Sequence, residues 1–314
     1  IRDRLISALQ KSVRWCEVNE SRYFARQLVD MGVPGVALSR LLLIAAEDVG
    51  LADPTLLIYV RSCLDSFENL VKQHGIKKLD AYKFQDLCDI VDRAAIAAAA
   101  SYKSRLLDLA FLATLYDIYE NEEFNDQLPD YLNKLATAVE NKDEKQALYY
   151  AFVAGLFLNS MDRILKWIQK QGENREHDLV REWVKEYKRK PEPLVFTGSI
   201  LMLCRDLDFK HGEFHNLIGN HFGTPIKKAQ IPDRAYDMHT RQGRKMVRGL
   251  VHFFKVGATV KNERFTNDWQ QVGETACFRA EKNGVLKTEK IIKVIEKKYQ
   301  GSQKTKVISE PLTF

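Results

Sequence analysis

Long apolar runs are missing from this sequence of 314 residues. No stretch approaches the ~18–20 consecutive apolar residues of a membrane-spanning helix. The first five residues include three charged side chains, where a signal peptide has its apolar stretch close behind a short basic start. We therefore expect no membrane-spanning segment and a cytoplasmic location.

Closely spaced cysteines are missing as well. The five cysteines are odd in number and scattered, at Cys16, Cys63, Cys88, Cys204 and Cys277. No two of them have the C-x-x-C spacing of a zinc or redox site, and a small secreted disulfide scaffold would have more of them in a shorter chain. We expect reduced, mostly buried thiols.

The short glycine-rich motifs of nucleotide-binding and hydrolytic enzymes do not occur either. There is no G-x-x-x-x-G-K-[ST] loop to hold a nucleotide phosphate, no G-x-G-x-x-G after a strand, and no G-x-S-x-G nucleophile elbow. Phosphate binding by a P-loop is therefore excluded for this chain, and no cofactor is expected.

What the sequence does contain is apolar residues at helical spacing almost throughout, with no strand-like alternation long enough to predict a sheet. Small residues at Ala94–Ala100 favour the close approach of a neighbouring helix, and Asn19 is expected to cap the second helix. We predict an all-α fold, a multi-helix collar-like bundle with an additional helical region and a basic C-terminal helix. The expected helices cover residues 1–15, 20–31, 36–48, 54–71, 82–100 and 104–121, three helices within 130–189, a short helix after 195 followed by a Gly/His/Asn-rich loop to 224, and helices at 238–257, 268–281 and 288–299.

A compact turn is predicted where the third helix meets the fourth. Glu47 and Asp48 close the third helix, Gly50 turns the chain, and Asp53 with Pro54 reads as an N-cap and a first-turn proline. We interpret the two adjacent carboxylates as helix-end charges rather than as a catalytic pair. The segment therefore indicates a structural corner.

Charge is distributed unevenly along the chain. Residues 1–160 hold 18 Lys and Arg against 23 Asp and Glu, whereas residues 225–264 hold 10 against 3 and residues 282–306 hold 8 against 2. A basic region joined to a mildly acidic body is typical of binding to a polyanion or to an acidic protein surface. We divide the chain into a collar-like region at 1–125, an additional helical region at 126–225, a basic helical region at 226–300 and a flexible tail at 301–314.

The densest basic segment lies within residues 237–254. Its four cations recur at helical spacing and would form one face suited to phosphates or acidic side chains, while histidines and two phenylalanines offer rings for stacking on bases. The alternative is a surface helix whose aromatic residues belong to the core. The candidate nucleic-acid or anion-binding residues are His239, Arg241, Arg244, Lys245, Arg248 and His252.

A second histidine-containing segment raises the question of a metal site. His211 and His215 would share a helix face, but the order H-x-E-x-H directs Glu213 away from a metal-bound water, and Gly212 and Gly219 weaken the helix. We therefore expect a polar loop here and no metal.

Three blocks of the N-terminal region resemble a known family. They are Leu9-Gln-Lys-Ser-Val-Arg14, Ala45-Ala-Glu-Asp-Val-Gly-Leu-Ala-Asp-Pro54 and Ser101-Tyr-Lys-Ser-Arg105. In this order they resemble the helical region that follows the ATPase module in the RarA/MgsA/Werner-helicase-interacting family of clamp-loader-like AAA+ ATPases, over about residues 1–120. The Ile231–Gly249 stretch resembles a later family segment, with His239 and Arg241 in the matching places.

The resemblance implies an oligomerising collar, a tetramer in the family, and action at DNA ends, gaps and stalled forks with single-stranded-DNA-binding protein as a partner. Our first hypothesis is a non-catalytic oligomerisation and interaction module of DNA replication or repair, whose basic C-terminal third contacts DNA or a partner. The alternatives are a free-standing scaffold or regulator that binds a replication ATPase without touching DNA, and a metal-dependent enzyme using the histidines of 211–221.

Overall fold

The computed structural model describes residues 1–120, 128–157, 160–174, 178–205, 213–265, 267–285, 290–295 and 297. These residues are almost all helical or in connections between helices, and the only extended pairing among them is an isolated bridge between Lys103 and Glu263. The prediction of an all-α, multi-helix fold is confirmed. None of the described helices has the length and apolar character that crossing a membrane requires.

The chain forms two compact units, each built from two separate stretches. Unit 1 comprises Ile1–Leu106 and Asp208–Thr266, and unit 2 comprises Leu107–Leu207 and Asn267–Phe314. In both units a C-terminal stretch returns to pack on helices that precede it by more than a hundred residues.

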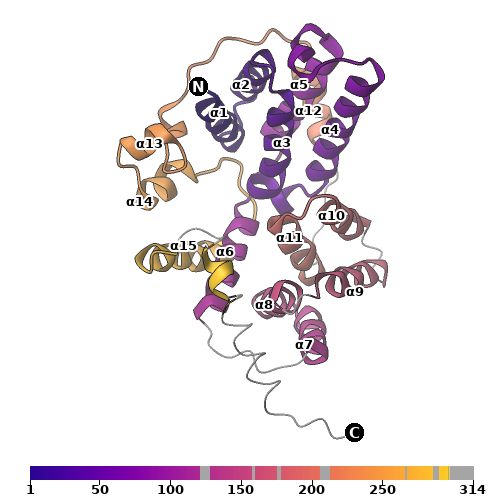
Figure 1. Cartoon of the computed structure of the whole chain (residues 1–314), viewed down its shortest axis with the longest axis vertical. Coiled ribbons are helices and arrows are strands. Elements are labelled where there is room, and N and C mark those ends of the chain that lie inside the picture. The colour runs from indigo at the N-terminus through magenta and orange to yellow at the C-terminus, as the bar shows by residue number, and fades with distance from the viewer. Residues whose placement is uncertain are drawn as a thin grey trace, which may run out of the picture. The chain divides into compact units, whose positions relative to one another are not determined.

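Unit 1 is a bundle in which α2 packs between α1 and α5 (Figure 1). The Ala-rich end of α5 is buried, and α5 also packs against α3, α4 and α12, which agrees with the expected role of its small residues. The helices of unit 1 are α1 (Arg2–Arg14), α2 (Val18–Asp30), α3 (Pro34–Ile44), α4 (Thr55–Gln73), α5 (Gln85–Ala100), α12 (Glu213–His221), α13 (Arg241–Lys245) and α14 (Leu250–His252). Its short π-helical turns are Ala45–Val49 and Phe253–Gly257, and its 3-10 turns are Gly50–Ala52, Lys78–Lys83 and Asp233–Ala235.

Unit 2 pairs its helices in sequence: α7 packs on α8, α9 on α10, and α10 on α11. The returning helix α15 packs on α6, where a Cβ on Gly273 would meet the side chain of Leu109 at 2.7 Å. The described residues 290–295 are helical, with Ile291 and Ile295 buried as their spacing predicts. The helices of unit 2 are α6 (Leu106–Glu120), α7 (Leu128–Glu140), α8 (Glu144–Phe152) with the π-helical turn Val153–Phe157, α9 (Met161–Asn174), α10 (Asp178–Arg189), α11 (Pro193–Cys204) and α15 (Asn267–Lys282).

Unit 2 depends on the absence of a side chain at Gly198. In α11 a Cβ at this position would lie 2.2 Å from the ring of Trp183, which is fully buried on α10. Gly198→Ala is expected to lower the free energy of unfolding by about 1–3 kcal/mol, because the fully buried indole would have to shift. Urea unfolding followed by Trp fluorescence measures this effect; an unchanged midpoint would contradict the packing.

Three local predictions were wrong. Asn19 does not cap α2, which begins at Val18; its side-chain amide instead bonds both backbone groups of Lys227. Residues 130–189 were expected to form three helices, but the described residues form four, α7 to α10. The expected Gly/His/Asn-rich loop contains α12, because burial of Phe214 and Ile218 stabilises a helix despite Gly219. The expected flexible tail at 301–314 lies outside the described residues.

Candidate functional site

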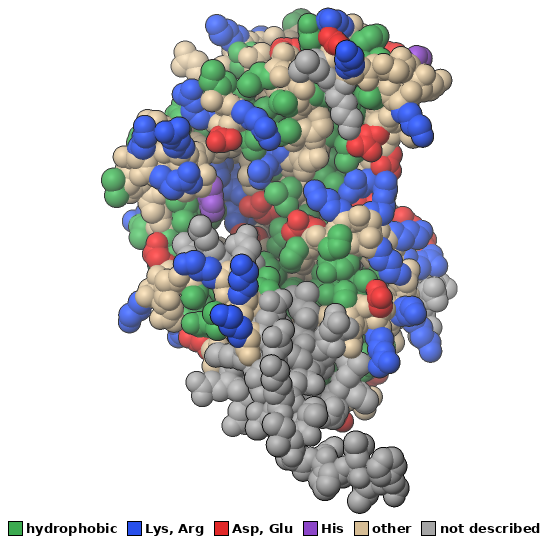
Figure 2. All heavy atoms as spheres, viewed as in Figure 1, with side chains coloured by type: hydrophobic (Ala, Val, Ile, Leu, Met, Phe, Trp, Pro, Cys, Tyr) green, Lys and Arg blue, Asp and Glu red, His purple; other side chains and the backbone are tan. Residues whose placement is uncertain are grey.

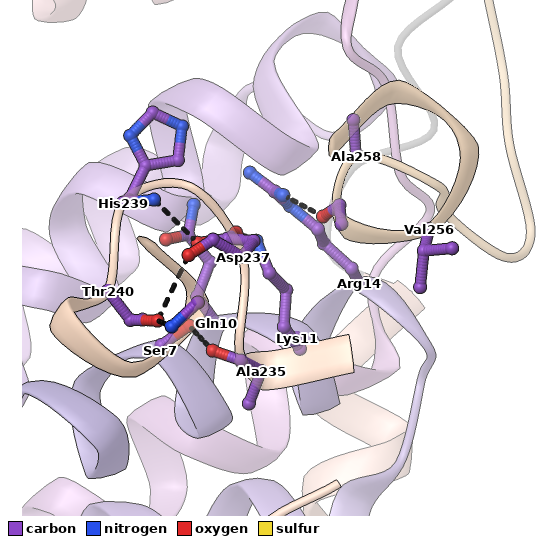
Figure 3. Close-up of polar contacts among 12 residues, drawn as sticks. Ser7, Gln10, Lys11, Arg14, Ala235, Asp237, His239, Thr240, Val256 and Ala258 are labelled. Atoms are coloured by element: carbon purple, nitrogen blue, oxygen red, sulfur yellow. Dashed lines mark hydrogen bonds and ion pairs between the residues drawn. The ribbon is translucent and has the colours of Figure 1, made fainter. Parts of the chain in front are cut away.

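The basic segment of unit 1 is anchored to α1 by a buried ion pair. Lys11 Nζ lies 2.7 Å from Asp237 Oδ2, and the two side chains are only 4% and 1% exposed (Figure 3). One turn earlier on α1, the Ser7 hydroxyl donates a hydrogen bond to the Ala235 carbonyl at 2.7 Å. Because Ser7 and Lys11 are four residues apart, their side chains lie on the same face of α1. This face holds the start of the basic segment.

Asp237 also shapes the backbone that leads into α13. Its carboxylate accepts from the His239 N–H at 3.0 Å, and its carbonyl accepts from the Thr240 hydroxyl at 3.0 Å. Thr240 then caps α13, since its Oγ1 accepts from the Gly243 N–H at 2.9 Å. Gly243 lies so close to this turn that a Cβ would be 1.9 Å from the Asp237 carbonyl oxygen. Three hydrogen bonds and this close backbone approach therefore fix the position of the basic residues.

Beneath the segment, Arg14 connects α1 to the corner after α3. Its Nε donates to Asp48 at 2.5 Å and its Nη2 to Glu47 at 2.8 Å, and its Nη1 donates to the Gly257 carbonyl. Gln10 also donates to Asp48, at 2.8 Å, and the backbone carbonyl of Asp48 accepts from Ser104 N–H. Asp48 is fully buried and Arg14 is 1% exposed. A charge pair this deep is stable only because nearly every polar atom has a partner.

The ring of Phe253 closes this cluster. Cations of Lys11, Arg14 and Arg105 lie 5.4, 6.0 and 5.7 Å from its centroid, and the His239 ring meets it edge-on at 4.9 Å. Cations are attracted to the face of an aromatic ring, and the attraction grows when the groups are shielded from water. Phe253 therefore joins the π-helical turn after α14 to the same charged residues that hold α1 and the corner together.

A pocket of about 340 Å³ opens beside this cluster. Three acidic and three basic side chains line the pocket. Lys11 is paired with Asp237 and Arg14 with Glu47, and the other two charged residues are Asp3 and Arg40. A pocket with equal numbers of acids and bases has no net attraction for a polyanion. The exposed cations outside it are the better candidates for an anion contact.

Burial changes the titration of two lining residues. Desolvation lowers the pKa of Lys11 to about 8, with the nearby Arg14 charge acting in the same direction and Asp237 opposing it. Desolvation also lowers the pKa of His239: the residue is exposed as a whole, but the inner edge of its ring packs on Phe253. A neutral His239 at physiological pH offers a hydrogen bond or a ring to a ligand rather than a positive charge.

The lowered Lys11 pKa makes a pH-dependent contribution to stability. Between pH 8 and 10.5 the unfolded chain binds a proton at Lys11 that the folded chain has released, so this residue raises stability as pH rises through that window. The slope is at most about 1.4 kcal/mol per pH unit. Wild-type protein should gain stability relative to Lys11→Met from pH 8 to 10.5 in parallel urea titrations; a constant difference would contradict the lowered pKa.

Three of the predicted anion-binding residues share α13 and are exposed: Arg241, Arg244 and Lys245. The side chains of Arg241 and Lys245 make no ion pair or hydrogen bond within the described part of the chain, whereas Arg244 donates to the His239 carbonyl at 3.1 Å. Figure 2 shows Lys and Arg side chains gathered where Figure 1 draws α13. No Asp or Glu occurs from residue 238 to 262, which holds six Lys and Arg.

The predicted continuous helix over 238–257 was wrong. α13 ends at Lys245, and the chain turns before α14 begins at Leu250. Arg248 therefore leaves the expected cationic face: its guanidinium makes two 2.8 Å bonds to the carboxylate of Asp233 and donates to the carbonyls of Asp233 and Tyr236. His252 is half-buried, and its Nδ1 has no hydrogen-bond partner among the described residues.

The predicted corner is confirmed, but its carboxylates have a different role from the one expected. Gly50 has the positive φ of +50° that lets the chain turn. The predicted start of the next helix was wrong by one residue, because α4 begins at Thr55 with Pro54 at its N-cap position, so Asp53 is not the N-cap and Pro54 is not in the first turn. Asp53 accepts a hydrogen bond from the Thr55 hydroxyl at 2.6 Å. Asp48 is not a solvated helix-end charge, because it is buried against Arg14 as described above.

Among the described residues no group of three or more His, Cys, Asp and Glu is placed to hold a metal ion. His211 and the side chain of Glu213 lie outside the described residues. His215 packs its ring against Tyr59 and Phe214, at 5.3 and 4.4 Å between ring centroids.

The sequence did not show that Lys11, Arg14 and Asp237 form one cluster with Asp48. The available signal was indirect: Lys11, Arg14, Asp48 and Arg105 all occur in the three blocks that resemble one family. In the structure, residues of all three blocks meet around Phe253 and the corner.

Comparison with known proteins adds one match. A sequence model for a family described as the C terminal region of the MgsA AAA+ ATPase matches residues 16–154, which is less than half of the chain. The match continues past the expected end of the resemblance at about residue 120, and it begins after the Lys11–Arg14 block. No curated protein and no solved structure matches the chain.

Proposed function

We propose that the chain is a non-catalytic interaction module that contacts nucleic acid through α13, and the match of residues 16–154 to the C-terminal region of the MgsA AAA+ ATPase supports this proposal. The observation that carries the proposal is the set of exposed cations Arg241, Arg244 and Lys245 on a rigidly anchored segment with no acidic residue from 238 to 262. Three clustered cations facing solvent suit phosphate groups, which supply most of the affinity in sequence-independent binding.

The pairing of the nearby acidic residues with other cations favours a binding role for α13 over a merely solvated surface. Asp233 and Asp237, the two acids nearest in sequence, are engaged by Arg248 and by Lys11 respectively. They therefore do not neutralise the α13 cations. A solvated basic face usually has acidic neighbours that pair with it at helical spacing, as on α10, where Lys185 pairs with Glu182.

We also propose that the module self-associates, as the collar of related ATPases does. The test combines both properties in one sample: anisotropy of labelled single-stranded and forked DNA over a salt series, and molar mass by light scattering. The proposal predicts binding that weakens steeply with salt and is reduced by Arg241→Ala with Arg244→Ala. Absence of binding at low salt would refute the nucleic-acid contact, and a monomeric mass at every concentration would refute self-association.

A further inference from the structure

The turn that ends α13 holds a valine in a backbone conformation that favours glycine. Val247 has φ +54°. Its N–H donates to the Arg244 carbonyl and the next N–H, of Arg248, donates to the Gly243 carbonyl, both at 3.1 Å. This is the hydrogen-bond pattern of a helix end whose left-handed residue is usually glycine. A β-branched residue is strained there, because its Cβ approaches the following carbonyl oxygen.

Among the residues that the structure describes, the same valine is also the most exposed large apolar residue. Val247 is 90% exposed, and the preceding Met246 is 42% exposed. Figure 2 shows apolar side chains at the outer edge of the region of α13. A strained, solvent-exposed apolar residue contributes nothing to folding that glycine would not, so Val247 is a candidate for a binding contact.

Resting on the proposed nucleic-acid contact, we propose that Met246 and Val247 form an apolar wedge that inserts between the bases of a strand held by the α13 cations. Apolar side chains beside Arg and Lys are the means by which proteins separate stacked bases while binding phosphates. Base faces are accessible in unpaired strands and are covered inside a closed duplex. Unstacking a base costs least in a strand that is already single, so the wedge favours single-stranded nucleic acid.

The charged residues next to the wedge indicate which partner binds it. The wedge directly follows the exposed cations Arg244 and Lys245 of α13, so the partner carries negative charge next to apolar faces. An anionic membrane also carries such charge, but two side chains present far less apolar surface than the helix faces that lie in membrane interfaces. A nucleic-acid strand matches both the charge and the small apolar contact.

Single-stranded DNA with an internal 2-aminopurine reports unstacking directly, because this base fluoresces more strongly when it is unstacked. Wild-type protein should raise the fluorescence on binding, and Val247→Gly should abolish most of the rise while keeping the fold, since glycine suits the backbone. The variant should also lose about fivefold or more of the preference for single strands over closed duplex, if the wedge matches one base-stacking contact.

Met246→Ser should weaken the fluorescence rise, whereas Met31→Ser should not, and Met31 has a matched exposure of 43% at the end of α2. If Val247→Gly binds and unstacks like wild type, the wedge is refuted while the cation contact stands. If no DNA binds at all, the proposed function itself fails. Binding to anionic vesicles that is reduced by Met246→Ser, without any effect on DNA, would also overturn the wedge.

Discussion

Replacing Asp48 by alanine is expected to lower the free energy of unfolding of unit 1 by about 3–5 kcal/mol. The carboxylate is the partner of Arg14 at 2.5 Å and of Gln10 at 2.8 Å, and it is fully buried. Its removal leaves the guanidinium, itself 1% exposed, with part of its charge uncompensated. Urea unfolding monitored by circular dichroism measures the loss, which is seen as a lower midpoint or as a separate early transition.

The neighbouring Glu47 provides the control. It contacts the same guanidinium at 2.8 Å but is 19% exposed, so water can replace it in part. Glu47→Gln is therefore expected to lower the free energy of unfolding by only about 1 kcal/mol. Equal effects of the two changes, or an Asp48→Ala effect below that of Glu47→Gln, would contradict the central position of Asp48 in the cluster.

Gly243→Ala is expected to destabilise the basic segment by about 3 kcal/mol or more, because the new methyl group would meet backbone rather than a movable side chain. The Asp237 carbonyl oxygen lies 1.9 Å and the Asp237 nitrogen 2.8 Å from the position of the Cβ. Relief requires α13 to move away from Asp237, which breaks the two hydrogen bonds that Thr240 donates to the Asp237 carbonyl. Faster hydrogen exchange of residues 237–248, together with weaker DNA binding, is the expected readout.

Gly249, six residues further on, is the matched control for this change. A Cβ there would meet nothing within 4 Å, and its φ of −89° is ordinary for any residue. Gly249→Ala is expected to change stability by no more than about 0.5 kcal/mol. If both glycines tolerate alanine equally, the basic segment is not fixed by its contact with Asp237.

The sequence predicted the parts of this fold that depend on local pattern. Apolar spacing located the N-terminal helices, and the block from Glu47 to Pro54 predicted a corner, because a glycine and an Asp-Pro pair restrict the backbone within a few residues. The α12 helix was missed because its stability comes from the burial of Phe214 and Ile218, which local composition does not report.

The site depended on contacts that no periodicity reveals. Lys11 and Asp237 are 226 positions apart, and Arg248 is diverted from the predicted cationic face by Asp233, fifteen residues earlier. The helical spacing of Arg241, Arg244 and Lys245 was real, but it ended at the turn containing Val247. Helical spacing alone could not show this turn, because valine is not a residue that predicts a left-handed backbone.

The most direct test of the nucleic-acid contact is the salt dependence of DNA affinity in two triple variants. One replaces Arg241, Arg244 and Lys245 of α13 by glutamine, and the other replaces three lysines of unit 2, Lys166, Lys170 and Lys185. Each lost phosphate contact is expected to reduce the slope of log affinity against log salt by about 0.7–0.9. We expect a slope shallower by about 2–3 for the α13 variant and no change for the unit 2 variant. The opposite result, or an equal change in both variants, would contradict the assignment of the contact to α13.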